Sequence, residues 1–168
     1  LYAFGYRARV GKDTAADYLS TKYGGERFAF SKALYDILHF AQSRCGFPLK
    51  KDRQFLQYIG TEWARSQEED VWVNILVKDV KEYMNNSKGN IYITDVRFPN
   101  EFNALKELGF TMIQIKGDSK SEFGTGSSNH KSEIALSEYE DSMWDHIIIN
   151  DGSLVDFYEK LDALLKKV

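Results

Sequence analysis

The stretch "GYRARVGKDT", residues 5–14, decides the fold that this sequence predicts. It follows the short apolar run "LYAFG", and it leads into "KDTAADYLSTKYG", where Ala15, Ala16, Leu19 and Tyr23 recur at helical spacing. The predicted order is therefore strand, loop and helix. A glycine-bearing loop in that position, with a lysine at the start of the helix, is typical of phosphate-binding loops, because backbone N–H groups and the positive end of the helix converge on an oxyanion.

The spelling of this loop departs from the common motif at its first glycine. Counted back from Gly11 and Lys12, the first glycine of G-x-x-x-x-G-K would fall at Tyr6, whereas Gly5 stands one residue earlier. Either Tyr6 serves here with a negative φ angle or Gly5 absorbs the sharp turn, and we expect the second, since glycine adopts positive φ angles without steric cost. The alternative is a chance glycine–lysine turn, and the position of the stretch between a strand and a helix argues against it.

Strand-like and helix-like segments alternate along the chain, with one interruption. Further strands are predicted at residues 27–30, 90–95, 110–116 and 146–150, and helices at 31–46, 51–65, 70–86, 100–109, 132–139 and 152–168. Three of these helices follow one another without a strand, so we expect an inserted helical block over about residues 31–86. Ser31 is the predicted cap of the helix over 31–46, and Ser153 with Asp156 forms a predicted capping box.

Five short strands that each lead into a helix predict an α/β fold. We expect a single domain over residues 1–168 with the three-layer P-loop NTPase fold and a five-stranded, mostly parallel sheet. Ligands of such sheets bind at the carboxyl ends of the strands. Residues 117–130 are rich in Ser and Gly and poor in apolar residues, which predicts a surface loop that acts as a lid over about residues 117–133.

Composition excludes several classes of partner. The net charge of -3 gives no general attraction to a polyanion, so we expect no nucleic-acid polymer as partner. No apolar run approaches the roughly 20 residues that span a bilayer, so we expect no membrane association. Cys45 is the single cysteine and cannot form an internal disulfide, which fits a reducing cytoplasm. Amphipathic helices look alike in a monomer and a homodimer, so a homodimer stays open.

Charged residues stand where two strands are predicted to end. In "YITDVRFPNE", Asp95 closes a buried strand and Arg97 follows it, so the carboxylate can face Mg²⁺ and the arginine can grip a phosphate with two N–H groups. The alternative is a structural salt bridge between these two residues. Asp13 follows Lys12, where it can hold Mg²⁺ through water or simply favour the start of the helix.

The sequence resembles the deoxynucleoside monophosphate kinases encoded by bacteriophages, a P-loop kinase family. The resemblance covers nearly the whole chain and rests on "GKDT" at 11–14, "LQYIGTEWAR" at 56–65, "DVWV" at 70–73, "DVRFPNE" at 95–101, "HKSE" at 130–133 and "NDGSL" at 150–154. It implies a nucleotide kinase with ATP and Mg²⁺ on the donor side and a deoxynucleoside monophosphate as acceptor. A phage-encoded enzyme of this kind would act in the host cytoplasm.

The resemblance also implies roles for individual residues. Catalysis is assigned to Lys12, Arg65, Arg97 and Asp95, and Mg²⁺ binding, through water, to Asp13 and Asp95. The ATP and phosphate contacts are assigned to Gly5, Arg9, Gly11, Lys12, Asp13 and Thr14, with Asn150 and Gly152 at the adenine. The acceptor contacts are assigned to Ser31, Lys32, Gln57, Arg65, Trp72 and Arg97. Gln57 can both donate to and accept from a base, and Trp72 either stacks on the base or lies in the core.

Two departures from the family pattern leave alternatives open. Tyr6 replaces a glycine, and no arginine follows Arg97, so the predicted lid carries only Lys120, His130 and Lys131 besides Lys116. Lysine supplies charge without the planar fork of arginine, so Arg9 and its neighbour Arg7, or arginines of the helical block, would have to cover the phosphates. The alternatives are a P-loop kinase of another acceptor, similar to dephospho-CoA or phosphomevalonate, and a nucleotide-binding module without catalysis.

Overall fold

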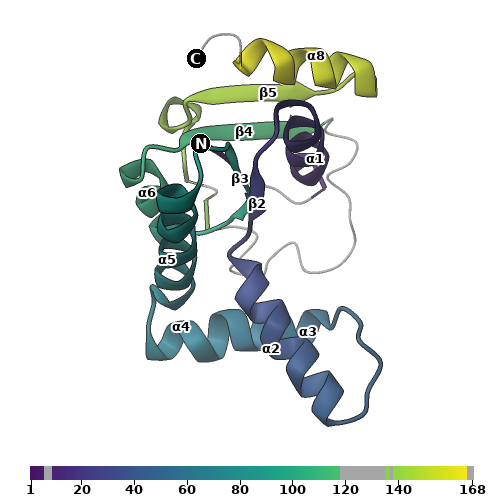
Figure 1. Ribbon diagram of the computed structural model, residues 1–168, viewed down its shortest axis with the longest axis vertical. Helices are drawn as coiled ribbons and strands as arrows, with labels where there is room; N and C mark the ends of the chain where they lie inside the picture. The colour runs from purple at the N-terminus through teal and green to yellow at the C-terminus, as the bar shows by residue number, and fades with distance from the viewer. Residues whose placement is uncertain (6–8, 118–134, 137, 166–168) are drawn as a thin grey trace.

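Five strands form one sheet in which every neighbouring pair is parallel (Figure 1). The computed structural model describes residues 1–5, 9–117, 135–136 and 138–165. The strands are β1 (Tyr2–Gly5), β2 (Glu26–Phe28), β3 (Ile91–Val96), β4 (Thr111–Gly117) and β5 (His146–Asn150), and their order across the sheet is β2-β3-β1-β4-β5. The predicted five-stranded sheet of a P-loop kinase fold is thereby confirmed, and β1, which leads into the predicted phosphate-binding loop, lies at its centre.

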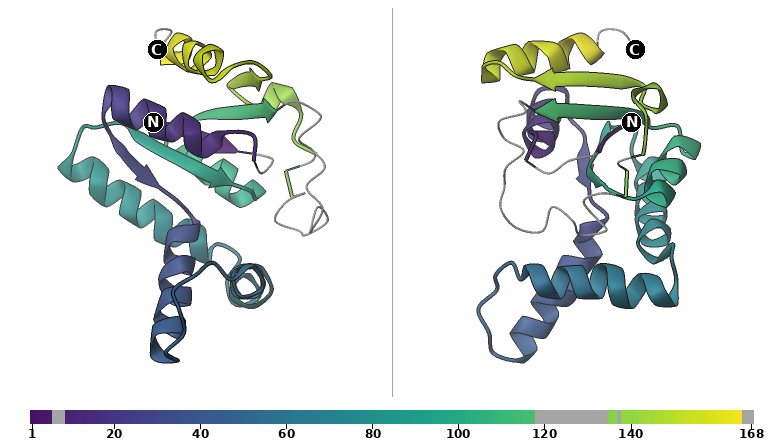
Figure 2. Two further views of the ribbon diagram at one scale, coloured as in Figure 1. Left: turned by 90° about the vertical axis from the view of Figure 1, so that its right-hand side faces the viewer. Right: turned by 180° about the vertical axis from the view of Figure 1, so that it is seen from behind.

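Helices cover both faces of the sheet and make three layers (Figure 2). In chain order they are α1 (Lys12–Tyr23), α2 (Ser31–Arg44), α3 (Arg53–Gln57), η1 (Tyr58–Trp63), α4 (Ala64–Gln67), α5 (Val71–Asn86), α6 (Pro99–Glu107), η3 (Asp141–Met143) and α8 (Leu154–Leu165). Buried residues of α1 and α8 pack on one face, and those of α5 and α6 pack on the other. On β4, Met112 joins the α5 and α6 side while Ile113 and Ile115 join the α1 and α8 side, as the alternation of a strand requires.

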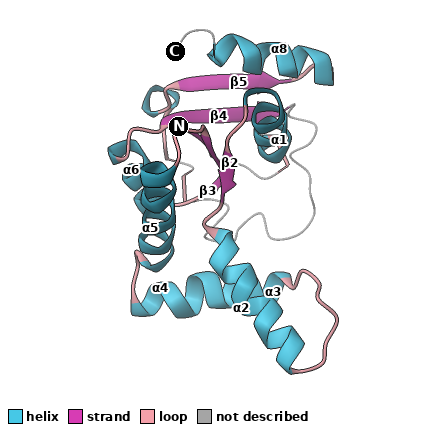
Figure 3. Cartoon of the chain, in the orientation of Figure 1, coloured by secondary structure: helices cyan, strands magenta, loops and turns pink. Residues whose placement is uncertain are grey.

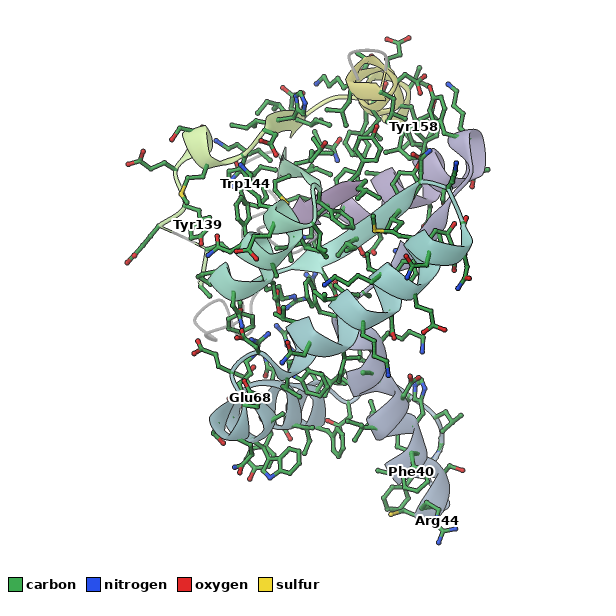
Figure 4. All side chains as sticks on the ribbon, turned by 60° about the vertical axis from the view of Figure 1, so that its left-hand side comes forward. Phe40, Arg44, Glu68, Tyr139, Trp144 and Tyr158 are labelled. Carbon is green, nitrogen blue, oxygen red and sulfur yellow. The ribbon has the colours of Figure 1, made fainter. Side chains whose placement is uncertain are left out.

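Of the predicted helical block over about residues 31–86, α2 and the continuous run α3, η1 and α4 project from the sheet, whereas α5 packs on one of its faces (Figure 3). Phe40 and Arg44 lie at the end of α2 that is farthest from the sheet (Figure 4). The middle of the run, η1, is a π-helical turn, which the helix pattern over residues 51–65 did not predict. Its backbone is held from two sides: Gly60 O accepts a 2.8 Å hydrogen bond from Trp72 Nε1, and Gly60 packs against Leu34 so closely that a Cβ would lie 2.8 Å from Leu34 Cδ2.

The cap of α2 differs from the sequence prediction. The N-cap position is Phe30, whose side chain makes no capping hydrogen bond, and Ser31 is the first residue of the helix. The carboxylate of Asp95, at the end of β3, accepts instead from Phe30 N at 3.0 Å and from Ser31 N at 2.9 Å. A negative charge at this end of a helix also interacts favourably with the helix dipole. The block is therefore tied to the carboxyl edge of the sheet. The other predicted cap, the capping box of Ser153 and Asp156 at the start of α8, is confirmed.

One extra residue in β3 changes the direction of its last side chains. Ala3 pairs with Ile93 and Gly5 with Val96, so three steps along β3 match two steps along β1. Ile91, Ile93 and Val96 all pack on the α5 and α6 side, which strict alternation would forbid. The irregularity falls at Thr94 and Asp95. Bulges of this kind re-aim side chains and are frequent beside functional sites.

Gly5 continues β1 and lies against the ring of Trp144. It pairs with Val96 on one side and Gln114 on the other, and a Cβ at this position would lie 2.5 Å from Trp144 Cη2 and 3.2 Å from Val96 Cβ. Trp144, which Figure 4 labels, is buried, and its ring packs edge-on against Phe102 of α6. The sequence therefore needs a glycine here to admit the indole, and not to make a turn.

We predict that Gly5→Ala destabilises the protein by about 1–3 kcal/mol, the usual cost of overpacking a rigid core. Urea unfolding monitored by circular dichroism would measure it. Trp144→Phe removes the second ring, so Gly5→Ala should cost less than half as much in that background. Equal costs in the two backgrounds would show that the indole is not the source of the constraint.

Candidate functional site

The loop between β1 and α1 turns at its far end, close to the helix. Among the described residues of the loop, positive φ angles occur at Arg9 (63°) and Gly11 (102°). The prediction that Gly5 absorbs the turn is therefore wrong, because Gly5 stays in the strand. Left-handed residues in a short loop turn successive N–H groups toward one side, which is how backbone nests bind anions. Tyr6, where the motif's glycine would fall, lies outside the described residues.

The first turn of α1 presents the amides that a phosphate-binding loop requires. The first helical hydrogen bond runs from Ala15 N to Gly11 O at 2.9 Å, so the N–H groups of residues 12–14 precede the helical ladder and point along the axis toward its start. This end of the helix carries partial positive charge. Lys12 and Thr14, both predicted phosphate contacts, lie in this turn and are half-buried.

The end of β5 braces the loop from behind. Asn150 Nδ2 donates to Val10 O at 3.0 Å. Gly11 lies so close that a Cβ would be 2.8 Å from the same nitrogen and 3.4 Å from the ring of Phe157. Asn150 and Gly152 were predicted beside the adenine. The structure adds a role that the sequence did not suggest, because the Asn150 side chain holds the backbone of the loop itself.

Asp13 joins the loop to two neighbouring strands. Its Oδ1 accepts from Thr94 Oγ1 at 2.9 Å and from Arg27 Nη2 at 2.7 Å, and Arg27 also pairs with Asp17 on the next turn of α1. Sequence reasoning missed Arg27, because a single arginine in a three-residue edge strand carries no pattern. Thr94 precedes Asp95, so the bulge in β3 brings both predicted Mg²⁺ carboxylates to one corner of the sheet.

The donors at this corner fit a magnesium ion held largely through water. Mg²⁺ keeps several water ligands and takes one or two carboxylates together with substrate phosphates. The side chain of Asp13 is 77% exposed, so its oxygens can be reached from solvent, whereas both oxygens of Asp95 accept from the start of α2. No group of three or more His, Cys, Asp or Glu side chains within the described part of the chain could form a closed metal cage. Asp13 is thus the better candidate for the nearer contact.

Arg65 and Glu101 form a buried ion pair between the block and α6. Arg65 Nη2 lies 2.5 Å from Glu101 Oε1, and the two side chains are only 9% and 3% exposed. The Arg65 guanidinium also lies 3.9 Å from the centre of the Phe98 ring and donates to Glu69 O at 3.0 Å. Arg65 was predicted to bind the acceptor phosphate. In this structure its guanidinium is anchored beside the segment that carries Arg97, which is the other predicted acceptor arginine.

Glu101 caps the start of α6 and also forms the ion pair with Arg65. Its Oε2 accepts from Arg97 N at 2.7 Å and from Phe98 N at 3.0 Å. Burial raises the pKa of the Glu101 carboxyl to about 7, because the positive charge of Arg65 and the two N–H groups offset only part of the lost hydration. Glu101 is part of the sequence motif "DVRFPNE", but the motif predicted no role for it.

The other predicted acceptor residues are Ser31, Gln57, Trp72 and Lys32. Ser31 lies at the start of α2 beside Asp95, and Gln57 is half-buried at the end of α3. Trp72 is 5% exposed in the core with its Nε1 bound to Gly60 O, so it presents no ring face to a base, and its assignment to the acceptor site is corrected. Lys32 is exposed and pairs with Asp36. The lid residues Lys120, His130 and Lys131 lie outside the described residues.

Together these contacts make a corner where an anion would be stabilised and aligned. The carboxyl end of β3, the start of α1 and the start of α2 meet there through Thr94, Asp13 and Asp95. The start of α1, whose first N–H groups precede the helical ladder, suits a phosphate group, whereas the start of α2 already binds the carboxylate of Asp95. None of the helices formed by the described residues combines the length and the apolarity needed to cross a membrane.

Comparison with known proteins points to one family. The family model described as deoxynucleotide monophosphate kinase matches residues 49–161. The uncharacterized protein ORF77 of Ictalurid herpesvirus 1 (strain Auburn) is 35% identical over 168 residues, which cover 97% of this chain and 69% of that protein. A deoxynucleotide monophosphate kinase of Escherichia phage RB69 is 27% identical over 116 residues, 68% of this chain and 44% of the phage protein.

A solved structure shares the fold. The dephospho-CoA kinase of Campylobacter jejuni superposes with a TM-score of 0.58 over 99% of this chain and 95% of that one, at 16% sequence identity. The likeness confirms the P-loop kinase fold and carries no information on the acceptor at this identity.

We predict that Glu101 makes stability depend on pH near neutrality. The folded state binds its proton more tightly than the unfolded chain, whose pKa is the ordinary 4.5, so the favourable contribution exists below that value and is lost as pH rises through 7. The free energy of unfolding of the wild type, minus that of Glu101→Gln, should fall by about 2–3 kcal/mol between pH 5 and pH 8. Urea titrations at four pH values would measure it, and a constant difference would contradict the assignment.

Proposed function

Because the chain belongs to the deoxynucleotide monophosphate kinase family, we propose that it transfers the γ-phosphoryl group of ATP to a deoxynucleoside monophosphate. The products would be the deoxynucleoside diphosphate and ADP. The observation that carries the proposal is the meeting of three element ends at one corner of the sheet, where Thr94 reaches Asp13 and Asp95 reaches the start of α2. A donor and an acceptor must both be held at one such corner for a direct transfer.

On the donor side, the loop and α1 would hold the triphosphate. The amides of residues 12–14 and the ammonium group of Lys12 would contact the β- and γ-phosphates, and Thr14 would add a hydroxyl contact. Arg9, exposed at the turn of the loop, would cover further phosphate charge. The segment at Asn150 and Gly152 would border the adenine, since it adjoins the loop through the Asn150 contact with Val10.

On the acceptor side, the monophosphate would lie between the block and the end of β3. Arg65 and Arg97 would contact its phosphate, and Ser31 with Gln57 would face the nucleoside. The proposal is supported by contacts that join the helical block, the end of β3 and the start of α6. Asp95 accepts from the start of α2, and Glu101 binds the guanidinium of Arg65 next to the backbone of Arg97. A contact from Lys32 to the acceptor would require its ion pair with Asp36 to break.

The reaction asks the protein chiefly to align two anions and to stabilise the charge of the moving phosphoryl group. An oxygen of the acceptor phosphate would attack the γ-phosphorus in line, and the bond from that phosphorus to the β–γ bridging oxygen would break, leaving its electrons on ADP. Lys12, Arg65 and Arg97 would stabilise the charge spread over the transferred group. Mg²⁺, held near Asp13 and Asp95 through water, would neutralise charge on the ATP phosphates.

An acceptor panel tests the function directly. ADP release would be followed with ATP and each of the four deoxynucleoside monophosphates, the four ribonucleotides, dephospho-CoA and phosphomevalonate. We expect turnover with at least one deoxynucleoside monophosphate. Turnover with dephospho-CoA or phosphomevalonate alone would assign another acceptor class, and ATP binding without any turnover would indicate a non-catalytic nucleotide-binding module.

We predict that Lys12→Ala lowers kcat by about a hundredfold or more, because it removes a cation from the charge that develops in the transition state. Circular dichroism should show an unchanged fold. Lys22→Ala is the matched control, since Lys22 lies at the other end of the same helix and pairs with Asp162. A Lys12→Ala enzyme with the turnover of the Lys22→Ala enzyme would refute the mechanism.

A further inference from the structure

We propose that Glu101 is the positioning residue of the acceptor site. The proposal rests on the function given above and deepens it, because it names the side chain that sets the two acceptor arginines relative to each other. One carboxylate contacts the guanidinium of Arg65 through Oε1 and the backbone of Arg97 and Phe98 through Oε2. The guanidinium of Arg65 and the backbone of Arg97 cannot move apart without breaking a hydrogen bond to this group.

The contacts on Arg65 leave part of its hydrogen-bonding capacity unused. Nη2 contacts Glu101, Nη1 donates to Glu69 O and, at 3.5 Å, to Asn100 Oδ1, and the guanidinium lies over the ring of Phe98. The buried Arg65 Nε has no partner among the described residues. A buried donor without an acceptor is costly, so it calls for a ligand atom or a particular function. An oxygen of the acceptor phosphate would satisfy it, because arginine binds phosphate through paired N–H groups.

A second set of contacts fixes the same junction from outside. Asn100 Nδ2 donates to Asp70 Oδ1 at 2.7 Å and to Glu69 O at 3.2 Å, so the start of α6 is joined to the turn between α4 and α5. These bonds are exposed, whereas the Arg65 to Glu101 pair is buried. Exposed polar contacts contribute little on their own, so the buried carboxylate is the group that determines the geometry.

The chemistry of Glu101 permits a substitution that separates positioning from capping. Glutamine keeps a carbonyl oxygen that can accept from the N–H groups of Arg97 and Phe98, so α6 stays capped. Its NH₂ group then faces the guanidinium of Arg65, and two donors cannot pair. Glu101→Gln therefore removes the carboxylate contact with Arg65, while the bond to Glu69 O and the helix start stay in place.

The test is isothermal titration with the deoxynucleoside monophosphate that the wild-type enzyme turns over best, in the presence of ADP and at pH 8, where Glu101 is ionised. We expect Glu101→Gln to weaken acceptor binding at least tenfold, about 1.4 kcal/mol, and to change ADP affinity less than twofold. In the Arg65→Ala background the same substitution should have little further effect, because the residue that it positions is gone.

Asp162→Asn is the matched control. Asp162 of α8 accepts from Lys22, Tyr18 and Tyr23 of α1, which lie on the other face of the sheet from α6, so it also ties two elements through one carboxylate. It should leave the affinities for both nucleotides unchanged. If Glu101→Gln weakens acceptor and ADP binding equally, or adds its full effect to Arg65→Ala, Glu101 has only a structural role and the proposal is wrong.

Arg65→Lys covers the case in which Glu101→Gln does not fold. It keeps the buried charge and the cap of α6 but removes the fork, and it should also weaken acceptor binding at least tenfold. Unchanged acceptor affinity would overturn the proposal. Failure of the proposed function is separate, because it shows in the wild type as an absence of transfer to any deoxynucleoside monophosphate before a variant is made.

Discussion

A parallel strand with one residue more than its neighbour must turn consecutive side chains out of strict alternation. In this chain the extra residue lies at Thr94 and Asp95 of β3, and each of the two side chains reaches a different helix start: Thr94 contacts Asp13 on α1, and Asp95 contacts the backbone at Ser31 on α2. The loop between β1 and α1 and the helical block are thus both attached to the end of the same strand.

The ion pair of Arg65 and Glu101 extends the same corner into the block. Burying two charges costs several kcal/mol in lost hydration, and apolar residues of similar volume often stabilise a protein as well or better. The pair is therefore poorly explained by stability alone. Its geometry is better explained by position, since the carboxylate fixes a guanidinium and the start of α6 together, next to the end of the bulged strand.

Local patterns in the sequence predicted most of the fold. Helical and strand periodicity located the five strands and the main helices, and the first of these patterns placed a loop between β1 and α1. Patterns could not predict contacts between distant residues. Asp95 caps a helix that begins 64 residues earlier, and Arg27 meets Asp13 across a strand edge. Trp72 looked equally suited to a base or a core until the packing around Gly60 was known.

The central position of β1 in the sheet affects the order in which the protein folds during synthesis. The strand β1, which precedes the other four in this sequence, lies between β3 and β4, and the bond from Thr94 to Asp13 joins residues 81 positions apart. Contacts of such long sequence separation form slowly, because a long stretch of chain must be closed before they contribute. We therefore expect a nascent chain to carry an unorganised N-terminal segment until β3 has left the ribosome. Competence to bind a nucleotide would thus arise late in synthesis.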